Sequence, residues 1–220
     1  LIFDKSWGRL VLSQPAAIKL VIDFADKFKI KKIFDAGDVQ ANGFQMLQDD
    51  HPWQTFNDTG STYMGYSVSA LLAAGMADSP ESSVSFTGDG SFMMNPQILI
   101  DAVHLRVKGI IVIFDNRRMA AISSLQMDQY GKDFSTSDNV KIDYVALANS
   151  IEGVMGVYGG DTPEQLNHAL VKATKHPGLS VIHVPVYFGE DELGGLGTYG
   201  KWNVGNWCEE VQKEKHKIGL

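Results

Sequence analysis

Residues 84–116, VSFTGDGSFMMNPQILIDAVHLRVKGIIVIFDN, decide the fold of this chain. A short apolar run at 84–87 ends in Gly-Asp-Gly, and a longer one at 110–114 ends in Asp-Asn. Between them, Asn95-Pro96 is typical of a helix start, with a cap followed by proline, and Gly109 is expected to end that helix. Two apolar strands joined by a helix predict a βαβ unit with parallel strands.

The same alternation continues on both sides of this unit. Upstream, the pattern predicts a helix capped by Ser13 and opened at Gln14-Pro15, a strand KKIF before Gly37, an irregular polar segment at 38–60 and a helix at 64–77. Downstream, it predicts a helix at 143–150, a strand at 154–158, a helix opened by a Thr162–Gln165 capping box and a strand at 179–186.

Strands that are apolar throughout and alternate with helices indicate an α/β fold, with a doubly wound, mostly parallel sheet and helices on both faces. No linker, repeat or low-complexity tract divides the chain. We therefore expect a single domain over residues 1–220, in which 188–220 form a C-terminal flap and tail.

The composition excludes several classes of function. The chain has 220 residues, a formal net charge of −7, 44% apolar and 20% charged residues, so no basic stripe is available for nucleic acid. The single cysteine, Cys208, excludes a disulfide framework, a Cys-rich zinc site and an iron–sulfur cluster held by this chain alone, and it favours a cytoplasmic location. No apolar run reaches the length of a membrane span, so we expect no membrane partner.

The two polar strand ends predict a binding site. Gly88-Asp89-Gly90-Ser91 follows one strand and Asp115-Asn116 follows the next. Because the carboxyl ends of successive parallel strands meet at one edge of a sheet, a carboxylate and an amide oxygen converge there. Such oxygens suit Mg²⁺ with phosphate, and glycines let the backbone approach an anion. Turn residues of no special function are the alternative interpretation.

The spacing of these strand ends resembles the metal–diphosphate motif GDG…NN of thiamine diphosphate enzymes. The resemblance implies that thiamine diphosphate binds with Mg²⁺, and that Asp89, Asn116 and the backbone carbonyl of Arg118 are the metal ligands. Gly88, Gly90 and Ser91 would contact the diphosphate. Asp115 departs from the first asparagine of the motif, which is not the usual metal ligand.

A second segment, NDTGSTYMGYSVSALLAAGMA at 57–77, resembles the acetolactate synthase and pyruvate decarboxylase group. By that resemblance Met64 wedges beneath the thiazolium ring, and its N–H and the carbonyl of Thr62 hold the aminopyrimidine. An ordinary core methionine is the alternative. Within the group, MGYSV, FDN followed by SSLQ, and KWNVGNW are most similar to trihydroxycyclohexanedione hydrolases.

The resemblance covers one domain type, the diphosphate-binding domain, and the pyrimidine-binding domain is absent from this chain. A pyrimidine-domain partner in a homo- or hetero-oligomer would then supply the glutamate that protonates N1′. The implied reaction cleaves or forms a C–C bond next to a carbonyl, on a ketone, a 2-oxo acid or a cyclic 1,2-dione. The alternatives are a non-catalytic regulatory or scaffolding relative, and a 2-oxo acid decarboxylase subunit of the sulfopyruvate decarboxylase type.

Other features carry weaker hypotheses. Residues 195–200 spell GxGxxG, but neither a strand before nor a helix after is predicted, which speaks against a nicotinamide-dependent oxidoreductase. We expect a mobile flap there, with Tyr199 and Trp202 as lids. His51 is a candidate for substrate contact. Arg117 and Arg118 suit an anionic substrate, and surface charge or intersubunit pairing is the alternative.

Overall fold

A computed structural model describes residues 1–58, 60–137 and 140–188. Its central sheet has six strands in the order β4-β3-β5-β6-β8-β7, and every neighbouring pair is parallel. The strands of this sheet are β3 (Lys31–Phe34), β4 (Thr55–Asn57), β5 (Ser83–Gly88), β6 (Gly109–Asp115), β7 (Met155–Tyr158) and β8 (Leu179–Pro185). The helices are α1 (Gln14–Phe28), α2 (Asp38–Phe44), α3 (Tyr66–Gly75), α4 (Asp89–Phe92), α5 (Ile98–His104), α6 (Ala120–Tyr130), α7 (Tyr144–Asn149) and α8 (Pro163–Lys175). The predicted fold class is confirmed.

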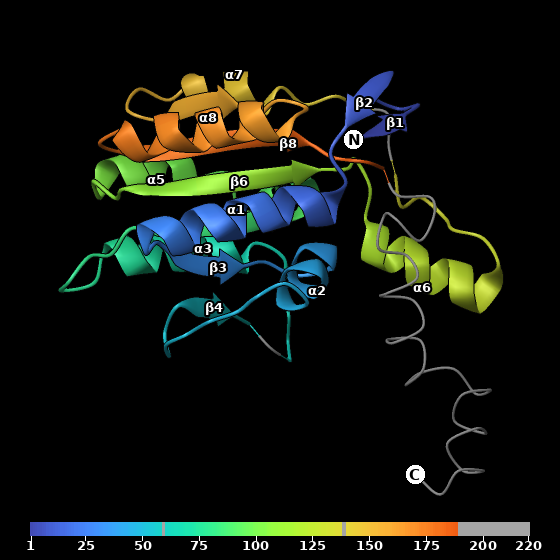
Figure 1. Ribbon diagram of the computed structural model, residues 1–220, viewed down its shortest axis with the longest axis horizontal. Helices are drawn as coiled ribbons and strands as arrows, with labels where there is room; N and C mark the ends of the chain where they lie inside the picture. Colours follow the sequence, from blue (N-terminus) through green and yellow to red (C-terminus); the bar gives the residue numbers. More distant parts are fainter. Residues whose placement is uncertain (59, 138–139, 189–220) are drawn as a thin grey trace, which may run out of the picture.

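Alternate side chains of the central strand β6 enter two different cores. Ile110, Val112 and Phe114 pack with residues of α1 and α8, whereas Ile111 and Ile113 pack with residues of α3, α5 and α7. Figure 1 shows α1 and α8 on one face of the sheet, in front of β6 and β8. Both faces of the strand are therefore buried, which explains why its sequence is apolar throughout.

Two helix starts that were predicted from capping residues are confirmed. The Ser13 hydroxyl accepts a hydrogen bond from the N–H of Ala16 at the start of α1. Thr162 and Gln165 form the predicted capping box at the start of α8. Each device satisfies N–H groups that have no partner inside the helix, so the sequence identified both starts correctly.

The predicted helix start at Asn95-Pro96 is wrong by two residues. Helix α5 begins at Ile98, and the carbonyls of Asn95 and Pro96 accept i+3 hydrogen bonds in a turn before it. The Asn95 side chain donates to Ser69 instead of capping. The helix also ends at His104, before Gly109, which is the first residue of β6.

The expectation that 38–60 is irregular is also wrong, because the segment contains α2 and the edge strand β4. Tertiary contacts override the polar sequence here: Gly43 of α2 packs so close to the Phe34 ring that a Cβ would lie 2.2 Å from it. Strand β4 pairs with β3 on one side only. An edge strand tolerates the polar composition that hid it from pattern reading.

Two elements at the carboxyl edge of the sheet had no sequence prediction. The first is an antiparallel hairpin of β1 (Ile2–Asp4) and β2 (Arg9–Val11), joined to the end of β8 by a parallel bridge between Leu12 and Val186. The second is α6, whose apolar residues do not recur at helical spacing. In Figure 1 both lie at the edge toward which the arrowheads of β3 and β6 point.

The longest helix in the described part of the chain is α1, with 15 residues. A transmembrane helix needs about 20 apolar residues. Within the described ranges, no helix combines the length and the apolar character that crossing a membrane requires.

Candidate functional site

A cavity of about 280 Å³ lies at the carboxyl edge of β3, β5 and β6. The structure brings all the sequence-predicted cofactor and metal residues to its wall: Thr62, Met64, Gly88, Asp89, Gly90, Ser91, Asn116 and Arg118. The wall also includes Gln14, Gly37, Asp38 and the first turn of α6. The predicted residues, which lie up to 56 positions apart in the sequence, thus share one site.

The tips of β5 and β6 lie at the same level because Gly88 pairs with Phe114 in the parallel register. Helix α4 begins at once after β5, so Asp89 is its first residue. Beyond β6 the chain folds back on itself. The Asp115 carboxylate accepts the N–H of Arg117 at 3.0 Å, and the Asn116 amide oxygen accepts the N–H of Arg118 at 3.0 Å. These two turns fix Asn116 beside the cavity.

The segment that carries Met64 is held by a buried carboxylate that sequence reasoning missed. Asp35 follows β3 and is fully buried. It accepts the N–H of Gly65 at 2.9 Å and the hydroxyl of Ser67 at 2.7 Å, and the Thr87 hydroxyl also donates to it, at 3.1 Å. The rule that located the other strand tips could have found Asp35, since it directly follows the strand before Gly37.

Met64 lies against the glycine-rich tip of β5. A Cβ built on Gly90 would be 3.3 Å from the Met64 Cε atom. Two residues before Met64, Thr62 has a left-handed φ of 48°, which is uncommon for a residue with a branched side chain. The methionine therefore occupies a defined position at the cavity wall, as a wedge beneath a ring would require.

Asp38 is a second acidic residue that the sequence did not single out. It is the first residue of α2, is only 7% exposed and lines the cavity. Burial raises the pKa of Asp38 to about 7, and the nearby charge of Arg118 opposes that rise. Within the described residues, its Oδ1 atom is buried without a hydrogen-bond partner. The cavity therefore has a carboxyl group that protonates near neutral pH.

The donor atoms at the cavity fit a metal-bridged diphosphate. The carboxylate of Asp89, the amide oxygen of Asn116 and the carbonyl of Arg118 are oxygen donors of the type that Mg²⁺ binds. In the described ranges, no group of three or more His, Cys, Asp or Glu residues could hold a metal ion by itself. Mg²⁺ commonly takes few protein ligands and completes its shell with phosphate oxygens and water. A small number of protein donors therefore suits a Mg²⁺ ion that also coordinates phosphate.

The side chains of Arg117 and Arg118, which follow Asn116, both have partners within the chain. The Arg118 side chain is 4% exposed, donates to the Ser123 hydroxyl and lies 3.6 Å from Asp133. Hydrogen bonds from Ser123 and Thr136, with a contribution from Arg118, lower the pKa of Asp133. The Arg117 guanidinium lies over the indole of Trp7, at 3.8 Å from the ring centre. Both side chains therefore make contacts within the chain.

Three further predictions fall elsewhere. His51 does not line the cavity that contains Asp89 and Asn116. It lies in a separate hollow with Lys29 and Trp53, at the amino end of β3. That position does not favour the hypothesis of substrate contact. The GxGxxG segment at 195–200, the lids Tyr199 and Trp202, the flap and tail beyond Phe188, and Cys208 lie outside the described residues.

Comparison with known proteins connects this site to one family. The model for the C-terminal TPP binding domain of thiamine pyrophosphate enzymes matches residues 35–184. A 3D-(3,5/4)-trihydroxycyclohexane-1,2-dione hydrolase of Shouchella clausii is 35% identical over 152 residues, covering 66% of this chain and 23% of the relative. The enzyme of the same name from Bacillus licheniformis is 29% identical over 212 residues, covering 92% of this chain and 32% of the relative. The chain spans about a quarter to a third of the length of these relatives.

Solved structures agree at the level of the fold. The thiamine diphosphate-dependent 4-hydroxybenzoylformate decarboxylase of Rhodococcus jostii RHA1 matches with a TM-score of 0.74 at 20% identity, over 83% of this chain and 34% of that one. Benzoylformate decarboxylase from Polynucleobacter necessarius matches with a TM-score of 0.68 at 18% identity, over 80% of this chain and 33% of that one. The resemblance inferred from the two sequence motifs is confirmed.

Proposed function

The chain belongs to the family of thiamine pyrophosphate enzymes as their C-terminal TPP binding domain, and from this premise we propose that its cavity binds thiamine diphosphate through Mg²⁺. Asp89, Asn116 and the carbonyl of Arg118 would hold the metal. The observation that supports this proposal most is the convergence of the predicted residues from two separate motifs on one cavity. Gly88, Gly90 and Ser91 provide a backbone that an anion can approach closely.

The proposed reaction makes or breaks a C–C bond next to a carbonyl group. When bound, thiamine diphosphate supplies the nucleophile and the electron sink for such chemistry. Met64 and the segment held by Asp35 would orient the ring system, and the apolar first turn of α6 would limit water at the cavity mouth. The relatives named trihydroxycyclohexanedione hydrolase favour a cyclic 1,2-dione substrate, with a 2-oxo acid as the second candidate class.

We also infer that a pyrimidine-binding domain completes the active site. The described residues that line the cavity include two carboxyl groups, Asp38 and Asp89, but no glutamate. In this proposal, the glutamate that transfers a proton to the pyrimidine belongs to the pyrimidine-binding domain. This makes a homo- or hetero-oligomer, or a longer chain, the functional form, and the cytoplasm the proposed location.

Calorimetric titration of thiamine diphosphate in the presence of Mg²⁺ tests the cofactor site. We expect saturable binding that disappears in EDTA and in the Asp89→Ala variant. Asp23→Ala is the matched control, because Asp23 is an exposed carboxylate on α1 that pairs only with Lys19 in the described structure. Binding that survives EDTA would contradict the metal bridge. No binding, even after addition of a pyrimidine-domain partner, would contradict the proposed function as a whole.

A further inference from the structure

Arg117 occupies a special position in the loop after β6. It lies between the two residues proposed as metal donors, Asn116 and Arg118, and its φ of 54° is left-handed. A residue with a side chain adopts this conformation only where its surroundings hold it there. Arg117 is not among the residues that line the cavity at the ends of β3, β5 and β6, but it lines a second hollow. Contacts of its side chain outside the first cavity can therefore hold this conformation.

The contact that holds Arg117 comes from the N-terminal hairpin. Its guanidinium lies 3.8 Å from the centre of the Trp7 ring, the geometry of a close cation–π contact. In the described part of the chain, the Nε and Nη2 atoms of Arg117 are buried without a hydrogen-bond partner. Since a buried cation needs a compensating contact, the indole face is the feature that offsets the burial of this side chain.

Trp7 is itself fixed by several hydrogen bonds. Its N–H donates to the Asp4 carboxylate at 2.9 Å, and its indole N–H donates to the carbonyl of Val186 at 3.1 Å. The other oxygen of Asp4 accepts the N–H of Phe188 at 2.6 Å. Strong local and long-range contacts thus place the indole ring at a defined point beside the end of β8.

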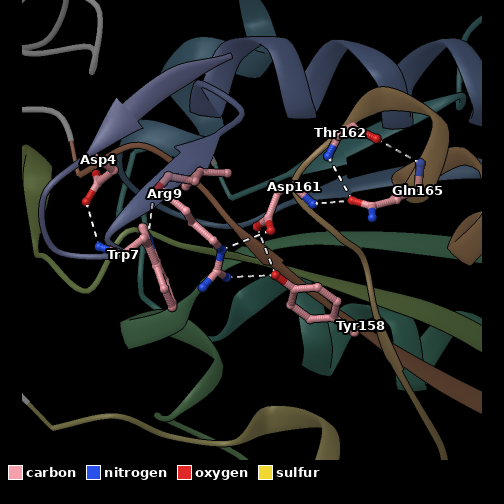
Figure 2. A network of polar contacts seen from close by, with 8 residues as sticks. Asp4, Trp7, Arg9, Tyr158, Asp161, Thr162 and Gln165 are labelled. Atoms are coloured by element: carbon pink, nitrogen blue, oxygen red, sulfur yellow. Dashed lines mark hydrogen bonds and ion pairs between the residues drawn. The ribbon is translucent and has the colours of Figure 1, made fainter.

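The far strand of the hairpin has an anchor of its own. The Arg9 guanidinium lies 2.9 Å from Asp161 and donates to the Tyr158 hydroxyl at 2.7 Å. Figure 2 shows Arg9 reaching from the hairpin to both partners, with Trp7 and Asp4 on the adjacent turn. The hairpin therefore has contacts at the carboxyl end of β7, through Arg9, and just beyond the end of β8, through Asp4 and Trp7.

A second contact supports the same loop from β8. The Asp115 Oδ2 atom lies 2.8 Å from Nε2 of His183, which is 8% exposed. The ring of His183 lies 5.1 Å from that of Tyr144 and 6.2 Å from that of Trp7. The aspartate that departs from the usual motif thus has a specific partner, and contacts from Trp7 and His183 converge on two adjacent turns.

We propose that the β1–β2 hairpin positions the metal loop, with Trp7 as a positioning residue that acts through Arg117 on Asn116 and the carbonyl of Arg118. This rests on the proposed function, since it assumes that these two groups bind Mg²⁺. Without the indole, the Arg117 side chain moves toward water and the backbone leaves its left-handed conformation. The metal donors then lose their alignment, although Trp7 touches neither of them.

The Mg²⁺ dissociation constant, measured at saturating thiamine diphosphate, tests the proposal. Groups that orient metal ligands typically change affinity by 10- to 100-fold, so we expect Trp7→Ala to raise this constant about 10-fold. Trp7→Phe keeps a ring face but loses the indole hydrogen bond to Val186, so it should raise the constant less than Trp7→Ala does. Phe3→Ala is the matched control, because Phe3 is an aromatic residue of the same hairpin but is 59% exposed, and it should have no effect.

A double-mutant cycle tests the route through Arg117. If Trp7 acts through this residue, Trp7→Ala should cause no further loss of Mg²⁺ affinity in an Arg117→Ala protein. Additive losses would overturn the proposed route. Thermal melting accompanies each titration. If Trp7→Ala fails to fold, Trp7→Leu replaces it, because leucine fills much of the volume without a π face; an unchanged Mg²⁺ constant in folded Trp7→Leu would overturn the proposal.

The metal site and the role of Trp7 can be disproved separately. A wild-type protein that binds thiamine diphosphate without any Mg²⁺ dependence contradicts the proposed metal site, and the role of Trp7 falls with it. A wild-type protein with normal Mg²⁺-dependent binding, beside a Trp7→Ala protein of equal affinity, contradicts only the role of the hairpin.

Discussion

The tips of β5 and β6 meet at the same cavity, but they are built by different means. The tip of β5 is Gly-Asp-Gly-Ser, and its neighbours are held by hydrogen bonds to the buried Asp35. The tip of β6 has no glycine; its turn contains a left-handed Arg117 that lies over Trp7, and an Asp115 that contacts His183. Small residues form the first tip, whereas the second consists of larger residues whose side chains contact segments far away in the chain.

This difference predicts how far the structural effect of a substitution spreads at each tip. At the β5 tip, damage should spread through the hydrogen bonds of Asp35 to the segment that carries Met64. At the β6 tip, damage should come from positions as distant as the N-terminal hairpin. Substitutions at each tip test that division.

Asp35→Ala should be the most damaging change at the β5 tip. It removes a fully buried acceptor and leaves the N–H groups of Gly65 and Ser67 without their partner. The hydroxyls of Ser67 and Thr87 each lose one of two hydrogen bonds. Unsatisfied buried donors each cost about 1–3 kcal/mol, so we expect the free energy of unfolding to fall by roughly 3 kcal/mol. Urea denaturation measures the loss. Asp23→Ala, at an exposed site, should change it by less than about 0.5 kcal/mol, and an equal loss in both would refute the assignment.

Asp115→Ala should be the most damaging change at the β6 tip. It breaks the buried contact with His183 and the turn to the Arg117 N–H, for which we expect a loss of about 2 kcal/mol in the free energy of unfolding. Asp115→Asn keeps an oxygen for the turn and an N–H that a neutral His183 can accept, so it should lose less. Asp115→Asn should also retain Mg²⁺ affinity. Identical losses of unfolding free energy in both variants would contradict a role for the Asp115 side chain in the turn and in the contact with His183.

The sequence predicted the β5 tip well because its signals are local. Gly88-Asp89-Gly90-Ser91 combines a strand end with residues that only a turn or a ligand site favours. The double-faced burial of β6 likewise made its strand readable as a continuous apolar run. Short-range patterns of this type determine the fold class, which was predicted, and they also indicated that the candidate site residues lie together at one edge of the sheet.

The support of the β6 tip was not predictable, since it depends on contacts between distant segments. Trp7 and Arg117 are 110 positions apart, and nothing near either residue indicates that they stack. The pairing of Asp115 with His183 joins two strands whose order in the sheet the sequence does not specify. Helix α2 and strand β4 were missed for a related reason, because their polar residues form regular structure only where the neighbouring β3 supports them.

The pH dependence of stability tests the charge of the cavity that both tips share. The pKa of Asp38 in the folded protein is about 7, above its ordinary value of 3.8. A carboxyl group with a raised folded-state pKa favours folding below its unfolded pKa, and this contribution is lost as pH rises from about 4 through about 7. Without metal or cofactor, Asp38→Asn should therefore become progressively more stable than wild type as the pH rises from about 4 through about 7.

Urea denaturation of both proteins between pH 4 and pH 8 measures this difference. The gap should be smallest at pH 4 and level off above pH 7. A gap that is constant across the range would show that the amide stabilises the cavity through packing or hydrogen bonding, and that the charge of Asp38 has no part in it.

Gly90→Ala should have the smallest effect on folding and still separate the two tips. The added methyl group would lie 3.3 Å from the Met64 Cε atom, which is the flexible end of its side chain, so the free energy of unfolding should fall by only about 0.5 kcal/mol. Displacement of Met64 should nevertheless weaken thiamine diphosphate binding severalfold, measured by calorimetry at saturating Mg²⁺. Leucine lacks the Cε atom, so Gly90→Ala should cause little further loss in a Met64→Leu protein. An equal loss in both backgrounds would mean that the methyl group opposes the ligand directly, and that the glycine of the β5 tip is required for ligand approach and not for the placement of Met64.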